Sequence, residues 1–148
     1  LTTILEKSLG AVAKGGSMPL NAVYEYAEEV TEPGFVFMDT PGYDPAAVTG
    51  QIAGGCNLVA FTTGRGSVSG YKPAPCIKIA TNTPMYEHIK EDMDINCGTI
   101  VDGTETIEQA GRRIFEFVIA TASGRKTASE AFDYGDNEFV PWQVGAIT

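Results

Sequence analysis

The residues best suited to chemistry follow a short apolar run. Asn57 to Phe61 has the length and composition of a strand buried on both faces. The next five residues are Thr62, Thr63, Gly64, Arg65 and Gly66. In open α/β sheets, the loop after a parallel strand borders the crevice where ligands bind. The glycines let the backbone approach a ligand, and the guanidinium can make two hydrogen bonds to a carboxylate or phosphate. This stretch predicts an anion-binding loop, with a surface turn carrying a solvated arginine as the alternative.

Other polar residues accompany further strand-like segments. Asp39 stands at the end of a strand expected at 35–38, and Asn82 lies just past one expected at 76–80. Lys78 is in the middle of the latter strand, where a charge needs a partner, water or a ligand unless it reaches solvent. Asp94 and Asn96 lie in a mixed segment, 93–100, which we interpret as containing a short strand. Because parallel strands end at one edge of a sheet, we expect these polar side chains to gather there.

The elements that must position these residues alternate between helices and strands. Leu20, Val23, Tyr24, Ala27 and Val30 recur at helical spacing after a candidate cap at Ser17, which predicts a helix over 18–32. Asp44-Pro45 opens a helix that Gly54-Gly55 ends, giving a strand–helix–strand unit typical of a parallel crossover. Further helices are expected at 1–10, 83–90 and 104–122. The pattern predicts a single α/β domain over 1–148, with 127–148 as an extended tail.

The composition excludes several classes of function. With 43% hydrophobic and 20% charged residues, the 148-residue chain is an ordinary globular sequence. A net charge of −9 argues against nucleic-acid binding, and no apolar run is long enough to cross a membrane. The three widely spaced cysteines, Cys56, Cys76 and Cys97, fit a reducing compartment, here the cytoplasm, and we expect most of them to be buried. The chain starts at Leu1, so we expect a fragment of a longer polypeptide.

Common catalytic motifs are missing from the sequence. His88 is the only histidine and lies in a polar helical stretch, so we expect it at the surface. No zinc, calcium, phosphate-loop or dinucleotide motif occurs. The remaining candidates include two cations and two carboxylates, a set suited to a polyhydroxy acid.

The chain resembles the C-terminal part of the altronate/galactarate dehydratase family over nearly its whole length. The resemblance rests on seven motifs in order: 6–10, 14–16, 54–56, 61–66, 78–82, 94–98 and 122–126. It implies a Rossmann-like, three-layer α/β fold with a mostly parallel sheet. It also implies a lyase that dehydrates altronate or galactarate to a 2-keto-3-deoxy acid with a divalent metal, usually iron. The same family contains a sulfolactate sulfo-lyase subunit.

The resemblance also implies partners. Full enzymes of this family carry an N-terminal small β domain and a central domain, so we expect this piece to be inactive alone. Alternatively, it is a non-catalytic binding or assembly module that acts as a lid or contributes to a homodimer. The loop at 68–74, Cys76 and Cys97 depart from the family pattern, whereas Cys56 matches it.

The hypothesis assigns roles to the candidates. Arg65 would hold a substrate carboxylate, with Gly64 and Gly66 beside it. Thr62, Thr63, Asn82 and Asn96 would contact the substrate. Lys78 would be a clamp or the base, and Asp39 an acid, a base or a metal ligand. Asp94 and Cys56 are the other metal-ligand candidates.

Overall fold

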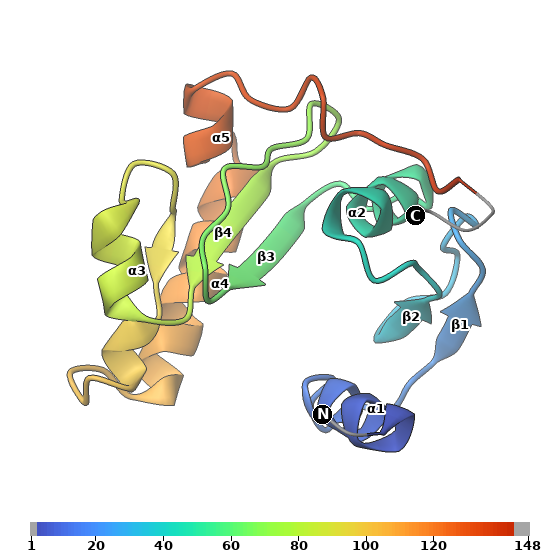
Figure 1. Cartoon of the computed structure of the whole chain (residues 1–148), viewed down its shortest axis with the longest axis horizontal. Helices are drawn as coiled ribbons and strands as arrows, with labels where there is room; N and C mark the ends of the chain where they lie inside the picture. The colour runs from blue at the N-terminus through green and yellow to red at the C-terminus, as the bar shows by residue number, and fades with distance from the viewer. Residues whose placement is uncertain (1–2, 144–148) are drawn as a thin grey trace.

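The computed structural model describes residues 3–143, which form an α/β structure with parallel strands (Figure 1). The α/β class is therefore confirmed. No helix within these residues is long and apolar enough to cross a membrane. The elements, in order, are α1 (Ile4–Ala13), β1 (Ala22–Tyr24), β2 (Val36–Met38), α2 (Asp44–Ala53), β3 (Val59–Thr63), β4 (Cys76–Ala80), α3 (Thr83–His88), β5 (Ile95–Asn96), the 3-10 helix η1 (Gly98–Ile100), α4 (Ile107–Ala122) and α5 (Ala128–Ala131).

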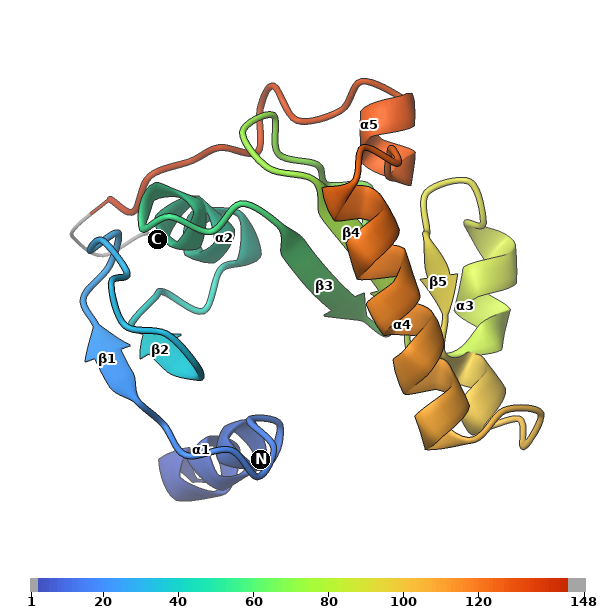
Figure 2. The ribbon, with the colours of Figure 1, turned by 180° about the vertical axis from the view of Figure 1, so that it is seen from behind.

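The larger sheet has the strand order β3-β4-β5, with all strands parallel. On one face, Ile77, Ile79 and Ile95 form a core cluster with Phe117 of α4, the helix that crosses the sheet in Figure 2. On the other face, Val59 and Cys76 pack with Val48 of α2 and with Tyr71. All five residues of β4 are buried, as expected for a central parallel strand. This sheet is therefore covered on both sides.

The smaller sheet corrects two expectations. Residues 22–24, predicted to be helical, form β1 and pair in parallel with β2, so the prediction of a helix over 18–32 is wrong. Ala27 has a positive φ of 61°, which a continuous helix does not accommodate. Pairing with residues distant in sequence overrode the helical spacing. In addition, β2 and β3 belong to different sheets, so the predicted strand–helix–strand unit does not form one crossover.

Most other elements match their predictions, with shifted ends. Strand β3 begins two residues later than expected and includes Thr62 and Thr63. Helix α4 begins after Thr106, whose side chain accepts a hydrogen bond from the Gln109 N–H. Ile107, the first residue of α4, is 70% exposed.

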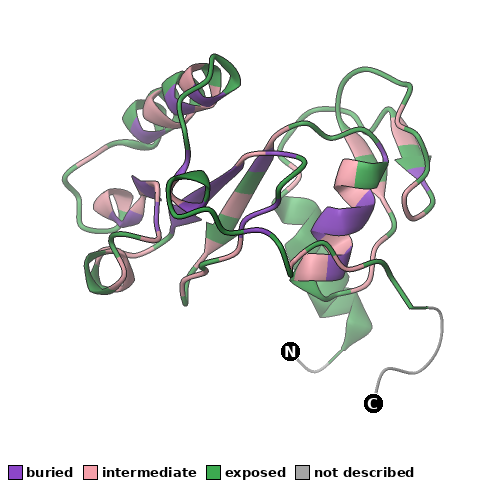
Figure 3. Ribbon diagram, turned by 90° about the horizontal axis from the view of Figure 1, so that it is seen from above, coloured by how far each residue is buried: buried purple, intermediate pink, exposed green. Residues whose placement is uncertain are grey.

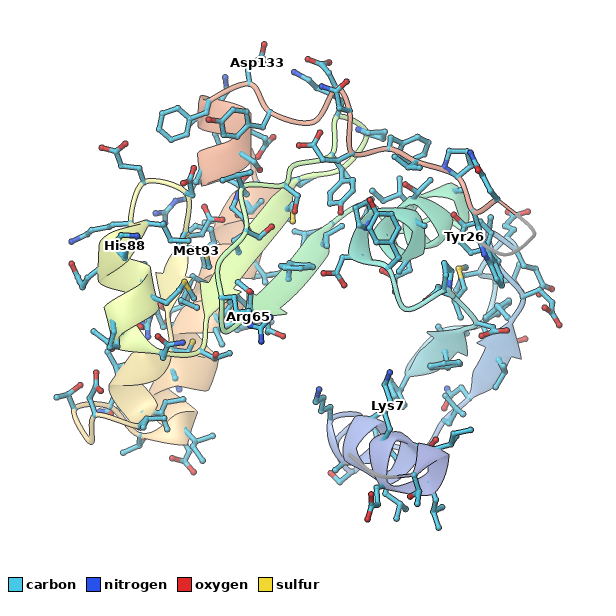
Figure 4. The ribbon with its side chains drawn as sticks, viewed as in Figure 1. Lys7, Tyr26, Arg65, His88, Met93 and Asp133 are labelled. Carbon is cyan, nitrogen blue, oxygen red and sulfur yellow. The ribbon has the colours of Figure 1, made fainter. Side chains whose placement is uncertain are left out.

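The region predicted as an extended tail contains the short helix α5. Beyond α5 the chain returns to α2, where the Val140 N–H donates to the Thr49 hydroxyl. The Trp142 N–H donates to the hydroxyl of Tyr26, which is labelled in Figure 4, and the two rings meet edge to face with their centroids 5.3 Å apart. The last part of the predicted tail, 144–148, lies outside the described residues.

Candidate functional site

A cavity of about 470 Å³ lies at the carboxyl end of β3. Its lining contains all five residues of the predicted anion-binding loop together with Asp44 of α2: Asp44, Phe61, Thr62, Thr63, Gly64, Arg65, Gly66 and Ser67. The structure therefore brings Thr62 to Gly66 into one site, which we call the β3 cavity. Asp44 was interpreted only as a helix cap, and nothing local in the sequence indicates that it reaches this loop.

Thr63 fixes the shape of the loop. Its hydroxyl oxygen accepts hydrogen bonds from the N–H groups of Arg65, at 3.3 Å, and Gly66, at 3.1 Å. Gly66 has a φ of +96°, a conformation that disfavours other residues. A Cβ at Gly66 would also come within 2.2 Å of Cδ1 of Ile89. The loop therefore needs both the hydroxyl and the glycine.

Asn82 ties the same loop to the next strand. Its amide donates to the Gly64 carbonyl at 2.9 Å, and its side-chain oxygen caps α3 by accepting from the Met85 N–H. The Thr81 N–H also donates to the Thr63 carbonyl. The ends of β3 and β4 are thus joined, and the Asn82 side chain holds loop 64–66 rather than lining the β3 cavity.

The Arg65 side chain is exposed at this end of β3 (Figure 4). The salt bridges within residues 3–143 use Lys72, Lys90 and Arg113, and none involves Arg65. Its guanidinium is therefore available to an external anion. Asp44 in the same lining adds a negative charge, which favours a ligand that also presents hydroxyl groups.

Lys78 is completely buried in the middle of β4, so it does not reach solvent. It is paired in register with Phe61 and therefore lies on the face of the sheet that carries the β3 cavity. However, its ammonium donates to the Ser69 carbonyl at 3.4 Å, beneath the loop that follows Gly66. Lys78 is thus close to the β3 cavity in the fold, but it is absent from the lining.

Two further polar groups lie under the same loop. The hydroxyls of Ser67 and Ser69 are 2.6 Å apart, which connects the β3 cavity lining to the residue above Lys78. The buried Tyr71 hydroxyl has no hydrogen-bond partner in the described chain, and burial raises its pKa to about 12. Tyr71 is consequently a neutral phenol at physiological pH.

Asp94 and Asn96 lie away from the β3 cavity. The Asp94 carboxylate accepts from the N–H groups of Lys78 and Ala128, so both oxygens bind backbone and fix α5 against β4. Both residues border a second cavity of about 500 Å³, which is also lined by Tyr86, Thr99, Thr104, Glu105, Gln109 and Arg113. There Arg113 is paired with Glu105 and holds the pKa of that carboxyl at about 2, with help from the Thr99 hydroxyl.

Asp39 and Cys56 are separated from both cavities. Asp39 follows β2 in the smaller sheet, where its N–H donates to the Tyr24 carbonyl, and Cys56 is exposed after α2. Asp39 therefore does not share an edge with Thr62 and Asn82, because β2 and β3 are in different sheets. Of the three cysteines only Cys76 is buried, which raises its pKa to about 11, so the expectation that most are buried is wrong.

The described residues do not form a complete metal site. Across positions 3–143, no three His, Cys, Asp or Glu side chains lie close enough together to hold an ion. Asp94 has both oxygens bonded to backbone, and Cys56 has no second candidate beside it. The iron implied by the family resemblance therefore does not fit a ligand set in this part of the chain.

Comparison with known proteins shows a consistent set of relatives. The sequence model of the family described as D-galactarate/Altronate dehydratase, C-terminal, matches residues 1–147. A galactarate dehydratase (L-threo-forming) of Escherichia coli is 40% identical over 126 residues, which is 85% of this chain and 24% of that protein. An altronate dehydratase of Bacillus subtilis is 34% identical over 134 residues, 90% of this chain and 27% of that protein.

A further relative has a different activity in its name. The (2R)-sulfolactate sulfo-lyase subunit beta of Chromohalobacter salexigens is 35% identical over 141 residues, 95% of this chain and 36% of that protein. This chain therefore spans about a quarter to a third of the length of these relatives.

Proposed function

Because this chain belongs to the D-galactarate/altronate dehydratase family and corresponds to its C-terminal domain, we propose that it forms part of a hydro-lyase acting on a sugar acid. The substrate would be galactarate or altronate, the substrates in the names of the similar dehydratases. The product would be a 2-keto-3-deoxy acid. The isolated domain is expected to be inactive.

The proposed reaction removes the proton next to a carboxylate and then expels the β-hydroxyl. That proton is only weakly acidic, so the enzyme must stabilise the negative charge that develops on the carboxylate while a base removes the proton. Arg65 would hold the carboxylate through its guanidinium. Thr62 would contact substrate hydroxyls, whereas Thr63 and Asn82 would act mainly by holding loop 64–66 in place.

The acid and base are less directly supported. Lys78 remains our candidate for a second clamp or the base, and it would need loop 66–70 to move before it met a ligand in the β3 cavity. Asp44 is the carboxylate already in that lining and becomes an additional candidate. Asn96 and Asp94 border the second cavity, so a role for them requires the substrate or another domain to reach that side.

The observation that carries the proposal is the unpaired Arg65 guanidinium in a cavity at a strand's carboxyl end. In the full-length enzyme, Arg65→Ala should lower kcat/KM for the sugar acid roughly tenfold to a hundredfold, because charge-assisted hydrogen bonds are lost. Arg65→Lys should recover only part of this loss, because an ammonium cannot form the paired contact. Arg112→Ala, on the exposed side of α4, is the matched control. Unchanged kcat/KM in Arg65→Ala would remove Arg65 from the site.

We propose that the full enzyme binds iron, as the family resemblance implies. Since residues 3–143 contain no suitable group of ligands, the ion would be held by the part of the polypeptide that the relatives carry beyond this domain. No step of the reaction is assigned to it. The cytoplasm is the proposed location, in keeping with three free cysteines.

The match to a sulfo-lyase subunit supports a second candidate function, the removal of sulfite from a sulfonated hydroxy acid. A sulfonate is also an oxyanion that Arg65 could bind. Product analysis separates the two: sulfite release identifies a sulfo-lyase, and a 2-keto-3-deoxy acid identifies a dehydratase.

A further inference from the structure

One side of the N-terminal region is apolar and bare. We call it the N-terminal face: four side chains of α1, two of the smaller sheet, and Phe35, which directly precedes β2. Its residues are Ile4, Leu5, Leu9, Val12, Val23, Phe35 and Phe37. All seven are between 40% and 87% exposed. Figure 3 shows α1 exposed along its whole length, and in Figures 1 and 2 it lies well apart from β3, β4 and β5.

Helix α1 has a complete N-terminal cap but little tertiary packing. Thr3 and Glu6 form a reciprocal capping box at its beginning, yet none of its residues is buried. The helix has only ten residues, and helices of this length are marginal in water without tertiary packing. Its apolar residues occupy one side, whereas Lys7 points elsewhere on the helix. Within residues 3–143, no contact buries the apolar side of α1.

The smaller sheet is covered on one side only. Tyr24 is buried, with its hydroxyl accepting from the N–H groups of Thr31 and Glu32. Val23 and Phe37 are register partners, so they project together from the opposite side, where they are 64% and 54% exposed. Two parallel strands alone are unstable, and parallel sheets normally have both faces covered. This sheet is therefore incomplete.

The two bare surfaces adjoin each other. A Cβ at Gly15, the second residue after the end of α1, would come within 3.1 Å of Cζ of Phe35. The side of α1 and the uncovered side of the sheet can thus be covered by one body.

The area available indicates the kind of partner. The chain exposes 9850 Å², whereas a monomeric protein of 15.7 kDa exposes about 7,300 Å². The excess, about 2,500 Å², is roughly three times what one partner contributes to an interface of standard size. This excess belongs to the whole chain, and seven of the 19 exposed large hydrophobic residues among the described positions lie on the N-terminal face. The relatives are about three to four times longer than the region they share with this chain, so the rest of their polypeptide is large enough to supply a covering body.

We propose that the N-terminal face is the docking surface for the remaining part of the dehydratase polypeptide, which covers the apolar side of α1 and completes the smaller sheet. This inference rests on the proposed function only in taking the covering body from a dehydratase of this family. It assigns α1, β1 and β2 to interdomain assembly and leaves the β3 cavity to ligand binding.

The test uses a chimera in which this chain replaces the matched region of E. coli galactarate dehydratase. Hydrogen exchange at residues 4–13 and 22–38 should be roughly tenfold slower in the chimera than in the isolated chain, because covered elements open less often. Leu9→Glu and Phe37→Glu should each remove this protection, whereas Lys7→Glu, on the same helix outside the N-terminal face, should not. If either variant prevents folding of the chimera but not of the isolated chain, that result also supports docking.

Two results would overturn the inference. One is equal exchange in the chimera and the isolated chain. The other is a dimer of the isolated chain, seen by sedimentation, that protects α1 and is abolished by Leu9→Glu, since a second copy would then be the occupant. Turnover of galactarate by the chimera is measured separately. Turnover without slower exchange at residues 4–13 and 22–38 would contradict only the docking inference. Slower exchange without turnover would contradict only the proposed function.

Discussion

The residue Arg113 connects three elements through one side chain. Its guanidinium donates to both carboxylate oxygens of Glu105 and to the Asn96 carbonyl, and the Thr99 hydroxyl donates to the same carboxylate. These bonds join α4 to the end of β5 and to η1. The Glu105 side chain is only 16% exposed. Sequence spacing alone could not indicate that Glu105 would pair with Arg113 and with Thr99.

This pair makes the stability of the protein depend on pH. The pKa of Glu105 falls from 4.5 to about 2 in the folded state, because the Arg113 hydrogen bonds favour the carboxylate. A depressed folded pKa contributes stability above the unfolded pKa, and this contribution is lost as the pH falls through the folded value. Urea unfolding should therefore show Glu105→Gln to be less stable than the wild type at pH 7, with the difference shrinking between pH 4.5 and 2. Glu116→Gln, on the exposed side of α4, is the control. A difference that does not change with pH would contradict this role.

Among single residues, the sequence predicted the surroundings of Arg65 better than those of Lys78. The glycines and threonines of 62–66 are local signals, and they do line one cavity. The surroundings of the Lys78 side chain depend on the conformation of loop 66–75. Its glycines and prolines do not determine that conformation, so the contact with Ser69 could not be predicted.

At the level of elements, local signals succeeded where breakers and periodicity agreed. Strand β4 has the predicted bounds, and α2 ends before Gly54 as predicted. Helix α2 begins one residue early, because Asp44, expected as its N-cap, is its first residue and Tyr43 is the N-cap. Strand β1 was missed because three residues are too few to show a period. Membership of β2 and β3 in different sheets was also missed, because pairing is a long-range property.

Two isoleucines differ sharply in burial, although both belong to the sheet and helix that form the core. Ile77 is completely buried between β4 and α4, whereas Ile107 at the start of α4 is 70% exposed. Ile77→Ala should lower the free energy of unfolding by about 2–5 kcal/mol, because it leaves a cavity. Ile107→Ala, the same change on the surface, should alter it by about 0.5 kcal/mol or less. Chemical denaturation of the chain measures both, and equal losses would show that the face of α4 towards the sheet has been misassigned.

At the level of the whole molecule, the C-terminal segment bridges regions that are distant in sequence. It runs from α5 back to α2 and contacts Tyr26, which also donates to the Ala46 carbonyl (Figure 1). The apolar residues of this segment show no regular period, so the sequence predicted an extended tail but could not indicate where it packs.

Removing the Trp142 ring should loosen the N-terminal region specifically. Trp142→Ala deletes the edge-to-face contact with Tyr26, which is worth about 1 kcal/mol. Hydrogen exchange in residues 22–30 should become roughly fivefold faster, while β4 should be unaffected. Phe115→Ala, an aromatic truncation on exposed α4, should leave both regions unchanged. Faster exchange throughout the chain would instead mean that Trp142 supports global stability.

The Thr63 hydroxyl, bonded to two loop N–H groups, has a consequence for affinity. The backbone around Arg65 already has its working shape before any anion arrives, so binding does not have to order that loop. Only the rotamers of one long side chain are then restricted, which limits the entropic penalty. Such preorganisation lets a small, strongly hydrated ligand be captured by very few contacts.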